Sequence, residues 1–433
     1  LIIFVISASF LSFAYGLAVG KYEVFPYASL KYVLNSVERV LADPASAMGT
    51  RPSSFLAETR YEGSGVTRYD EDAVLPGTTL LSGFFDNELP EIRLISLDGE
   101  VIKSWPVSVL DLFPDLSHVK PEDDIPANDW GAAVHGLRME RDGSILFNFD
   151  GKGTAKLDRC GDVVWTLPQM THHSIDRSHD GSYWIPSRHW RETTGTTEMF
   201  RLPYRDDTIL RVSAEGEVLF EISMNQILVD NGLYSILVAN GDFETKMRKD
   251  DVLHINDIEE LPADLAEAFP HFEAGDLLLS MRHLNLLLVV DPDDWAVKWY
   301  QVGPWLRQHD PDFQSDGTIT VFNNNSDDTL HGELLGGSNI LRVEPFSPTR
   351  EVSVWYDDDE TPGFFTNTQG KHQVLSNGNT LIAEYWGGRV IEVTPDGKIV
   401  WEFINRYDDE AVAKISGAVR YPVGYLLDPD WSC

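Results

Sequence analysis

The feature that most constrains this chain is a hairpin that recurs six times after residue 77. Each copy is an apolar strand, a tight turn that often contains Asp-Gly, and a second strand that usually ends on Trp. The copies cover residues 97–105, 157–165, 212–220, 290–299, 343–355 and 393–401, spaced roughly 46–79 residues apart. Repeats that each supply a four-stranded antiparallel sheet are typical of a β-propeller. We therefore predict an all-β fold with six four-stranded blades; two stacked β-sandwiches, the alternative, would not explain the register.

A second recurring segment, which begins with His, lies between these hairpins and is followed by a turn and an apolar strand. Its five copies start at His135, His173, His254, His309 and His372. Inner strands of a propeller line its central channel, so equivalent positions converge on one ring. The first blade, residues 77–107, lacks such a strand, and residues 417–427 can supply it and place Arg420 near the His position. We expect the ring of blades to close there, without an open sheet edge.

The N-terminal region is predicted to lie outside the propeller. Residues 1–20 carry no charge and are long enough to span a bilayer, which favours an uncleaved transmembrane anchor over a signal peptide. Apolar residues at helical spacing predict an amphipathic helical extension over residues 21–43. Residues 44–76 are interpreted as a linker and residues 77–430 as the propeller. The protein is then membrane-anchored, with a membrane-complex partner or a second copy as its expected protein partners.

Charge and cysteine content exclude other functions. Lys and Arg number 34 against 69 Asp and Glu, a net charge of −35, which repels nucleic acid. Cys160 and Cys433 are the only cysteines, so one disulfide is possible and a Cys-x-x-Cys metal site is not. The polar run at residues 323–328 is interpreted as a solvated loop. A Ca²⁺-dependent propeller hydrolase would need Asn, Asp or Glu where the repeat supplies His.

Two chemistries use a ring of histidines. Neutral imidazoles can hold Zn or Cu, or one imidazole can be the nucleophile in a group transfer while others move protons. Asn256 follows His254 closely, Arg282 precedes another His, and residues 307–308 are Arg-Gln directly before His309. Cations beside the ring oppose a metal and favour transfer of an anionic group. We therefore expect anion transfer without a metal.

These residues resemble the bacterial arylsulfate sulfotransferases, a nucleotide-independent family of six-bladed periplasmic propellers. The resemblance rests on short motifs in this order: Thr-His-His-Ser at 171–174, Leu-His-Ile-Asn-Asp at 253–257, Ser-Met-Arg-His at 280–283, Arg-Gln-His-Asp at 307–310 and Lys-His-Gln-Val-Leu-Ser-Asn-Gly at 371–378. It implies that His309 accepts the sulfuryl group as a sulfohistidine. It also implies that His254 and Asn256 contact the sulfuryl or bridging oxygens, that Arg282 clamps the anion, and that the adjacent pair His172 and His173 supplies a further imidazole.

The function implied is transfer of a sulfuryl group from an aryl sulfate to a phenolic or alcohol acceptor, with no cofactor. Further substrate contacts are expected from His172, His135, His372, Arg420 and, as part of an aromatic wall, Trp386. The resemblance places the propeller on the periplasmic side of the membrane. The alternative is a membrane-tethered binding or assembly subunit in which the histidines have no catalytic role.

Overall fold

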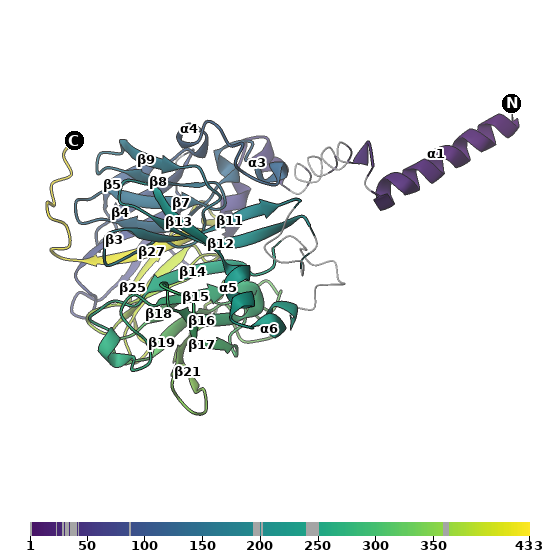
Figure 1. Ribbon diagram of the computed structural model, residues 1–433. Coiled ribbons are helices and arrows are strands. Elements are labelled where there is room, and N and C mark those ends of the chain that lie inside the picture. The colour runs from purple at the N-terminus through teal and green to yellow at the C-terminus, as the bar shows by residue number, and fades with distance from the viewer. Residues whose placement is uncertain are drawn as a thin grey trace.

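The computed structural model describes residues 2–22, 24–27, 30, 34, 41, 43–85, 88–193, 200, 202–239, 251–357 and 363–433. The amphipathic helix expected over residues 21–43 falls largely outside these residues. What is described confirms the predicted all-β propeller of six blades, each a four-stranded antiparallel sheet (Figure 1). The blades are numbered here from the N-terminal end.

The strands run from the channel outwards in the order given. Blade 1 consists of β27 (Ile415–Pro422), β3 (Gly77–Phe84), β4 (Pro90–Ile95) and β5 (Val101–Pro106). Blade 2 consists of β6 (Val134–Met139), β7 (Ile145–Phe149), β8 (Gly153–Leu157) and β9 (Val163–Leu167). Blade 3 consists of β10 (Asp176–Arg177), β11 (Tyr183–Arg191), β12 (Tyr204–Val212) and β13 (Val218–Ser223).

The second half of the ring repeats this plan. Blade 4 consists of β14 (Ile255–Glu260), β15 (Leu277–Met281), β16 (Leu286–Val290) and β17 (Val297–Val302). Blade 5 consists of β18 (His309–Phe313), β19 (Ile319–Asn323), β20 (Asn339–Val343) and β21 (Val352–Tyr356). Blade 6 consists of β22 (Lys371–Val374), β23 (Thr380–Glu384), β24 (Arg389–Val393) and β25 (Ile399–Ile404).

The C-terminal strand and the N-terminal strand of the propeller pair with each other. β27 lies antiparallel to β3, with Arg420 opposite Thr79 and Pro422 opposite Gly77. This pairing closes the ring, because blade 1 takes its inner strand from the end of the chain and its other three from the start. Beyond β27, a disulfide joins Cys160 of blade 2 to Cys433, with 5.7 Å between their Cα atoms.

The segment 44–76 differs from the expected linker. It contains α3 (Pro44–Ala47) and two short strands, β1 (Leu56–Glu58) and β2 (Gly65–Tyr69). β1 pairs with β26 (Ala411–Ala413), and β2 adds a fifth strand to the outer edge of blade 6. The linker prediction was wrong here, because backbone groups at an exposed sheet edge can pair with any extended segment, whatever its side-chain pattern.

The recurring aromatic residues connect neighbouring blades. The indole nitrogen of Trp401 donates to the Leu97 carbonyl of blade 1, and that of Trp165 donates to the Ala214 carbonyl of blade 3. Trp401 is fully buried within a cluster shared by blades 6 and 1. The hairpin that defined the sequence repeat therefore also supplies contacts between blades.

The first helix, α1 (Ile2–Tyr22), has 21 residues and a mean hydropathy of 2.2. Its length and composition suffice to cross a membrane, and nearly all of its side chains are exposed. In Figure 1, α1 lies on one side of the propeller and the C-terminal tail on the opposite side. The remaining described α-helices are short: α4 (Val109–Leu112), α5 (Met224–Asp230) and α6 (Tyr234–Ala239).

Candidate active site

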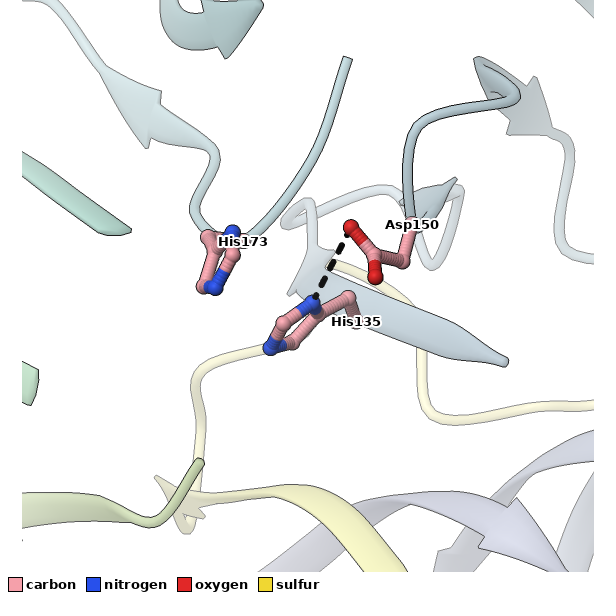
Figure 2. A group of neighbouring side chains, drawn as sticks. All are labelled: His135, Asp150 and His173. Atoms are coloured by element: carbon pink, nitrogen blue, oxygen red, sulfur yellow. Dashed lines mark ion pairs between the residues drawn. The ribbon is translucent and has the colours of Figure 1, made fainter. Parts of the chain in front are cut away.

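Four imidazoles meet where the inner strands begin, at the end of the channel that we call the mouth. The ring centre of His173 lies 3.9 Å from that of His135, 5.0 Å from that of His254 and 6.0 Å from that of His309. All come from different blades, in agreement with the predicted convergence. Figure 2 shows His135 and His173 side by side, with Asp150 across from His135. The Nδ1 atom of His135 is 3.9 Å from an Asp150 carboxylate oxygen.

The backbone at these positions departs from regular strand geometry. His173 and His254, which lie just before or at the start of inner strands, have φ angles of 58° and 55°, and Arg307 has 55°. Pairing of β18 with β19 also shifts register between His309 and Pro311. Positive φ costs free energy for residues other than Gly and is concentrated at functional sites. These three residues lie in or next to the short segments that lead into the inner strands of blades 3, 4 and 5.

A hydrogen bond fixes the proton on His309. Its Nδ1 atom lies 2.6 Å from Oδ1 of Asn324, which is fully buried. The Asn324 amide nitrogen donates to the carbonyls of Thr366 at 2.9 Å and Gln369 at 2.6 Å, so the other amide atom must be the oxygen. His309 therefore carries its hydrogen on Nδ1, and the lone pair is on Nε2. The sequence prediction missed Asn324, because its run of polar residues also fits a solvated loop.

The nearby His254 is paired with a carboxylate. Its Nδ1 atom lies 2.7 Å from Oδ2 of Asp251, three residues earlier in the chain. Burial raises the pKa of the Asp251 carboxyl, but its contact and hydrogen bond with His254, together with the charge of Arg188, hold that pKa well below its usual range. The ionised carboxylate accepts the Nδ1 hydrogen and leaves Nε2 available for proton transfer, as in other acid–base pairs. Asp251 was also missed; its spacing from His254 was the available signal.

Three histidines of the mouth, His173, His254 and His309, are neutral at neutral pH. Burial, followed by the positive charge of Arg282, lowers the pKa of His309 well below its usual range. Burial, followed by electrostatic repulsion from the neighbouring imidazole of His135, does the same to the pKa of His173. The pKa of His254 is also lowered, because burial outweighs the opposing effect of Asp251. A neutral imidazole keeps the lone pair that a nucleophile or base requires.

Arg282 supplies positive charge among these rings. It follows β15 directly, is almost fully buried and donates from a guanidinium nitrogen to Nε2 of His283 at 3.1 Å. Its charge lowers the pKa of both His309 and His254. A planar guanidinium can pair with two oxygens of a tetrahedral anion at once.

Two further predicted residues lie against the backbone of the mouth. Asn256 is fully buried, and its amide nitrogen donates to the Gln308 carbonyl at 2.6 Å, next to His309. This bond holds the segment that carries His309, and one amide hydrogen remains for the predicted contact with substrate. His172 is also fully buried and shares a hydrogen bond with His173 between their Nδ1 atoms at 2.9 Å. It therefore positions His173 from behind.

His372 does not join the other four histidines. His135, His173 and His309 each precede their turn Gly by eight residues, whereas His372 precedes Gly378 by six. The equivalent position in blade 6 is residue 370, a Gly with φ of 102° where a Cβ atom would collide with the ring of Phe322. His372 lies deeper in the channel and bonds to Asp310 and to Thr320, the latter at 2.7 Å.

Arg420 also has a different place from the one predicted. Its guanidinium is buried against Glu392, at 2.8 Å, and donates to the Thr79 hydroxyl and the Leu75 carbonyl, both also at 2.8 Å. Both members of the ion pair have no exposed side-chain surface. Arg420 therefore joins blades 1 and 6 at the closure of the ring and does not face a substrate. Sequence position near the His repeat could not distinguish these two orientations.

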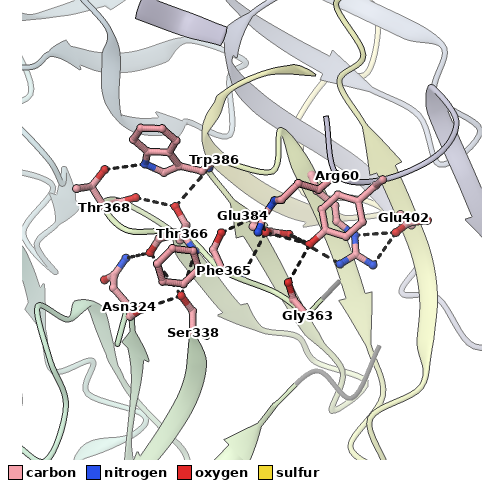
Figure 3. A network of polar contacts seen from close by, with 12 residues as sticks. Arg60, Asn324, Ser338, Gly363, Phe365, Thr366, Thr368, Glu384, Trp386 and Glu402 are labelled. Atoms are coloured by element: carbon pink, nitrogen blue, oxygen red, sulfur yellow. Dashed lines mark hydrogen bonds and ion pairs between the residues drawn. The ribbon is translucent and has the colours of Figure 1, made fainter. Parts of the chain in front are cut away.

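Trp386 lies on the rim of the mouth, between β23 and β24. It is 37% exposed, its indole nitrogen donates to the Thr368 hydroxyl at 3.1 Å, and Lys414 lies over its ring at 4.3 Å. Figure 3 shows that Thr366 links this tryptophan to Asn324. The rim is thus connected to the support of His309, and the aromatic wall predicted at Trp386 stays a prediction.

Below the histidines, the central channel holds a cavity of about 220 Å³ that all six inner strands or their leading segments line. Its lining residues include five carboxylates and two cations: Asp176, Asp257, Glu259, Asp310, Asp312, Arg138 and Lys371. Burial raises the pKa of Asp257 to about 7, even though Lys371 donates to it at 3.1 Å. An anionic substrate is therefore favoured at the mouth and disfavoured deeper in the channel.

Three groups of described side chains have the spacing of metal ligands. They are His135 with Asp150 and His173, Asp251 with His254 and His283, and Asp310 with Asp312 and His372. Each contains a ligand in contact with a cation: Arg188 is 3.4 Å from Asp150, Arg282 is 3.1 Å from His283 and Lys371 is 2.6 Å from Asp310. These neighbours oppose a metal cation and suit an anion.

Comparisons with known proteins identify the family of this chain. A search of curated proteins finds no significant match. Similar solved structures include a Bacteroides caccae protein of unknown function (14% identity, 76% of this chain and 93% of that chain, TM-score 0.46). A streptogramin B lyase is 15% identical over 82% of this chain and 88% of that chain, with a TM-score of 0.40. A Staphylococcus aureus virginiamycin B lyase is 12% identical over 67% of this chain and 84% of that chain, with a TM-score of 0.36. Likenesses this distant say nothing about activity. The model of the arylsulfotransferase (ASST) family, however, matches residues 137–406, more than half of the sequence, and the chain therefore belongs to that family.

Proposed function

We propose that this protein transfers a sulfuryl group from an aryl sulfate to a phenolic or alcohol acceptor through a sulfohistidine at His309. The observation that carries the proposal is the state of His309. Its Nδ1 hydrogen is held by Asn324 at 2.6 Å, its pKa is lowered by burial and by Arg282, and its Nε2 atom keeps a lone pair. Family membership supports sulfuryl transfer as the reaction.

In the first half-reaction, Nε2 of His309 attacks sulfur in line with the bond to the aryl oxygen. The N–S bond forms as the S–O bond breaks, and the electron pair of that bond leaves with the phenolate. Arg282 pairs with the sulfuryl oxygens, whose charge must be balanced during transfer. The arriving anion favours protonation of His254, and His254 Nε2 then passes this proton to the phenolate, which leaves as phenol.

In the second half-reaction, neutral His254 takes the proton of an acceptor hydroxyl. The acceptor oxygen attacks sulfur, the N–S bond breaks, and the electron pair returns to Nε2 of His309. The product is a new sulfate ester. As it leaves, His254 releases the acceptor proton to solvent, and the enzyme returns to its initial state with both His309 and His254 neutral. Two half-reactions through a covalent intermediate predict ping-pong kinetics.

We further propose that the propeller lies outside the cytoplasm, tethered by α1. The helix is long and apolar enough to span a membrane. The bond between Cys160 and Cys433 supports an oxidising compartment, since disulfides are rare in reducing ones.

The proposal is tested with purified full-length protein, a chromogenic aryl sulfate and phenol, in the presence of EDTA. We expect phenol-dependent release of the chromophore and, without acceptor, added sulfate mass on the peptide that contains His309. His309→Asn should abolish both, while the matched control His271→Asn, at an exposed position, should retain both. Activity in folded His309→Asn would refute the assignment. Neither release nor adduct from the unmodified, folded protein would favour a tethered assembly role.

A further inference from the structure

The loop between β19 and β20 exposes three leucine side chains to solvent. Leu330 is 80% exposed, Leu334 74% and Leu335 51%. The loop is nevertheless ordered by its own polar groups: an Asp327 carboxylate oxygen accepts from the backbone amides of Leu334 at 2.8 Å and Leu335 at 3.0 Å. Neighbouring apolar side chains displayed on a fixed loop mark an interaction surface.

This leucine loop, residues 327–335, lies at the mouth. β19 runs antiparallel to β18, with Phe322 opposite His309, so β19 ends where β18 begins. Asn324, the residue that holds the His309 proton, comes three positions before the loop. Arg307, two residues before His309, lies 3.6 Å from Asp328 within it. The leucine loop therefore lies at the same end of the channel as the proposed nucleophile.

The chain that follows α1 also reaches the propeller at the mouth. Lys414, directly before the inner strand β27, donates from its backbone to the Phe55 carbonyl at 2.8 Å and from its side chain to the Ser54 carbonyl at 3.0 Å. Arg60 then donates to the Phe365 carbonyl at 2.7 Å and pairs with Glu384, on the rim near Trp386 (Figure 3). The side of the propeller near α1 in Figure 1 is accordingly the mouth.

We propose that the leucine loop inserts into the same bilayer that α1 spans, so that the mouth faces the membrane surface. The helix α1 and the leucine loop are both apolar and lie at the same face of the protein, and a bilayer is the environment that can take up both. The net charge of −35 makes an uncharged, zwitterionic lipid surface the fitting one, because anionic headgroups would repel the propeller. Resting on the proposed function, the acceptor class follows: a membrane-dissolved amphiphile with a phenolic or alcohol hydroxyl.

Orientation is measured first, without reference to activity. A polarity-sensitive fluorophore is attached to Leu334→Cys, or to Val423→Cys as the matched control, in full-length protein in phosphatidylcholine vesicles. Val423 is 80% exposed and directly follows β27, at the opposite end of the channel. Both described cysteines are bonded to each other, so the new thiol is labelled selectively. We expect blue-shifted emission and strong quenching by brominated lipid at Leu334→Cys alone. Equal emission and quenching at both sites would overturn the proposal.

One further outcome would identify a different occupant of the leucine loop. If the emission of the label at Leu334→Cys shifts with protein concentration in detergent without vesicles, the loop binds a second copy and the membrane proposal fails.

An activity assay tests the acceptor class. Replacing Leu330, Leu334 and Leu335 together by Ser should lower kcat/KM for a membrane-dissolved phenol by roughly tenfold and leave kcat/KM for a water-soluble phenol unaffected. An equal loss for both acceptors would contradict the proposal. Absence of sulfuryl transfer by the unmodified protein would refute the proposed function but not the membrane insertion, because the fluorescence experiment does not depend on activity.

Discussion

Replacement of Asn324 by Asp tests the assigned state of His309 directly. The substitution keeps an oxygen where Nδ1 donates at 2.6 Å, and it adds a negative charge at that oxygen. An opposite charge in hydrogen-bond contact raises the pKa of an imidazole by about 1–3 units. The nucleophile would then be protonated over a wider range of pH, and a protonated Nε2 cannot attack sulfur.

The expected result is a displaced pH profile. In the unmodified protein, the pKa of His309 is held well below its usual range, so its ionisation does not reduce kcat/KM as pH falls through 6.5. In Asn324→Asp, the acid limb of kcat/KM should move upward by about 1–3 pH units, with about a tenfold loss per unit along that limb.

Asn324→Leu is the matched control. Both variants lose the donors to the Thr366 and Gln369 carbonyls, at a cost of about 1–3 kcal/mol of stability for each carbonyl left unpaired. The leucine variant adds no charge but leaves the His309 proton unplaced, so kcat/KM should fall by about 10²–10⁴ at every pH.

The assay is the initial rate of phenol release from an aryl sulfate across the acidic and neutral range, with folding verified by urea denaturation. The reasoning is refuted if the Asn324→Asp profile superimposes on that of the unmodified protein. Full activity in Asn324→Leu would equally refute it.

Three further predictions concern other charged groups. Arg282→Lys should lower kcat/KM about 10²-fold in steady-state assays, because an ammonium cannot pair bidentately with sulfuryl oxygens; recovery of full activity by Lys would contradict the clamp. Arg420→Met leaves Glu392 buried without its guanidinium and should cost about 3–5 kcal/mol in urea denaturation, with kcat unchanged for the folded fraction. Burial lowers the pKa of His283 to about 4, so the unfolded chain protonates first and stability is lost as pH falls from 6.5 to 4. Each pKa unit corresponds to 1.36 kcal/mol, so His283→Gln should remove about 3 kcal/mol of this pH-dependent loss of stability. Thermal melts at several pH values measure it, and an unchanged slope of unfolding free energy against pH would refute the prediction.

Much of the fold could be predicted from the sequence because a propeller is built from local repeats. Each hairpin is specified by a turn and two apolar strands within one short segment, and copies of the unit at related spacing imply the ring. The aromatic residue at the end of each hairpin helped to identify the repeat in the sequence. In the structure, two of these residues, Trp401 and Trp165, contact the next blade. Local patterning could not show that β2 would pair with the edge of blade 6, because edge pairing uses backbone groups.

The candidate site was predicted in part for the same reason. His135, His173, His254 and His309 occupy starts of successive inner strands, and ring geometry brings such positions together. The prediction for His372 was wrong because this residue precedes its turn by two residues fewer than the other histidines do, which places it deeper in the channel. The prediction for Arg420 was wrong because its ion-pair partner, Glu392, comes from another blade. Residue identity at a repeat position therefore predicted proximity but not orientation.

The sequence by itself thus determined the number of blades, the convergence of histidines from successive blades and the presence of an apolar helix, since all three follow from periodicity and composition along the chain. Only the tertiary structure decided which nitrogen of His309 holds the proton, which histidine pairs with Asp251, and which face of the propeller residues 54–60 contact. These depend on contacts between residues of different blades or loops, such as Asn324 with Gln369 and Lys414 with Ser54. Hydrogen bonds of this kind require atoms placed to within a fraction of an ångström, and no pattern of residue types along the chain carries that information.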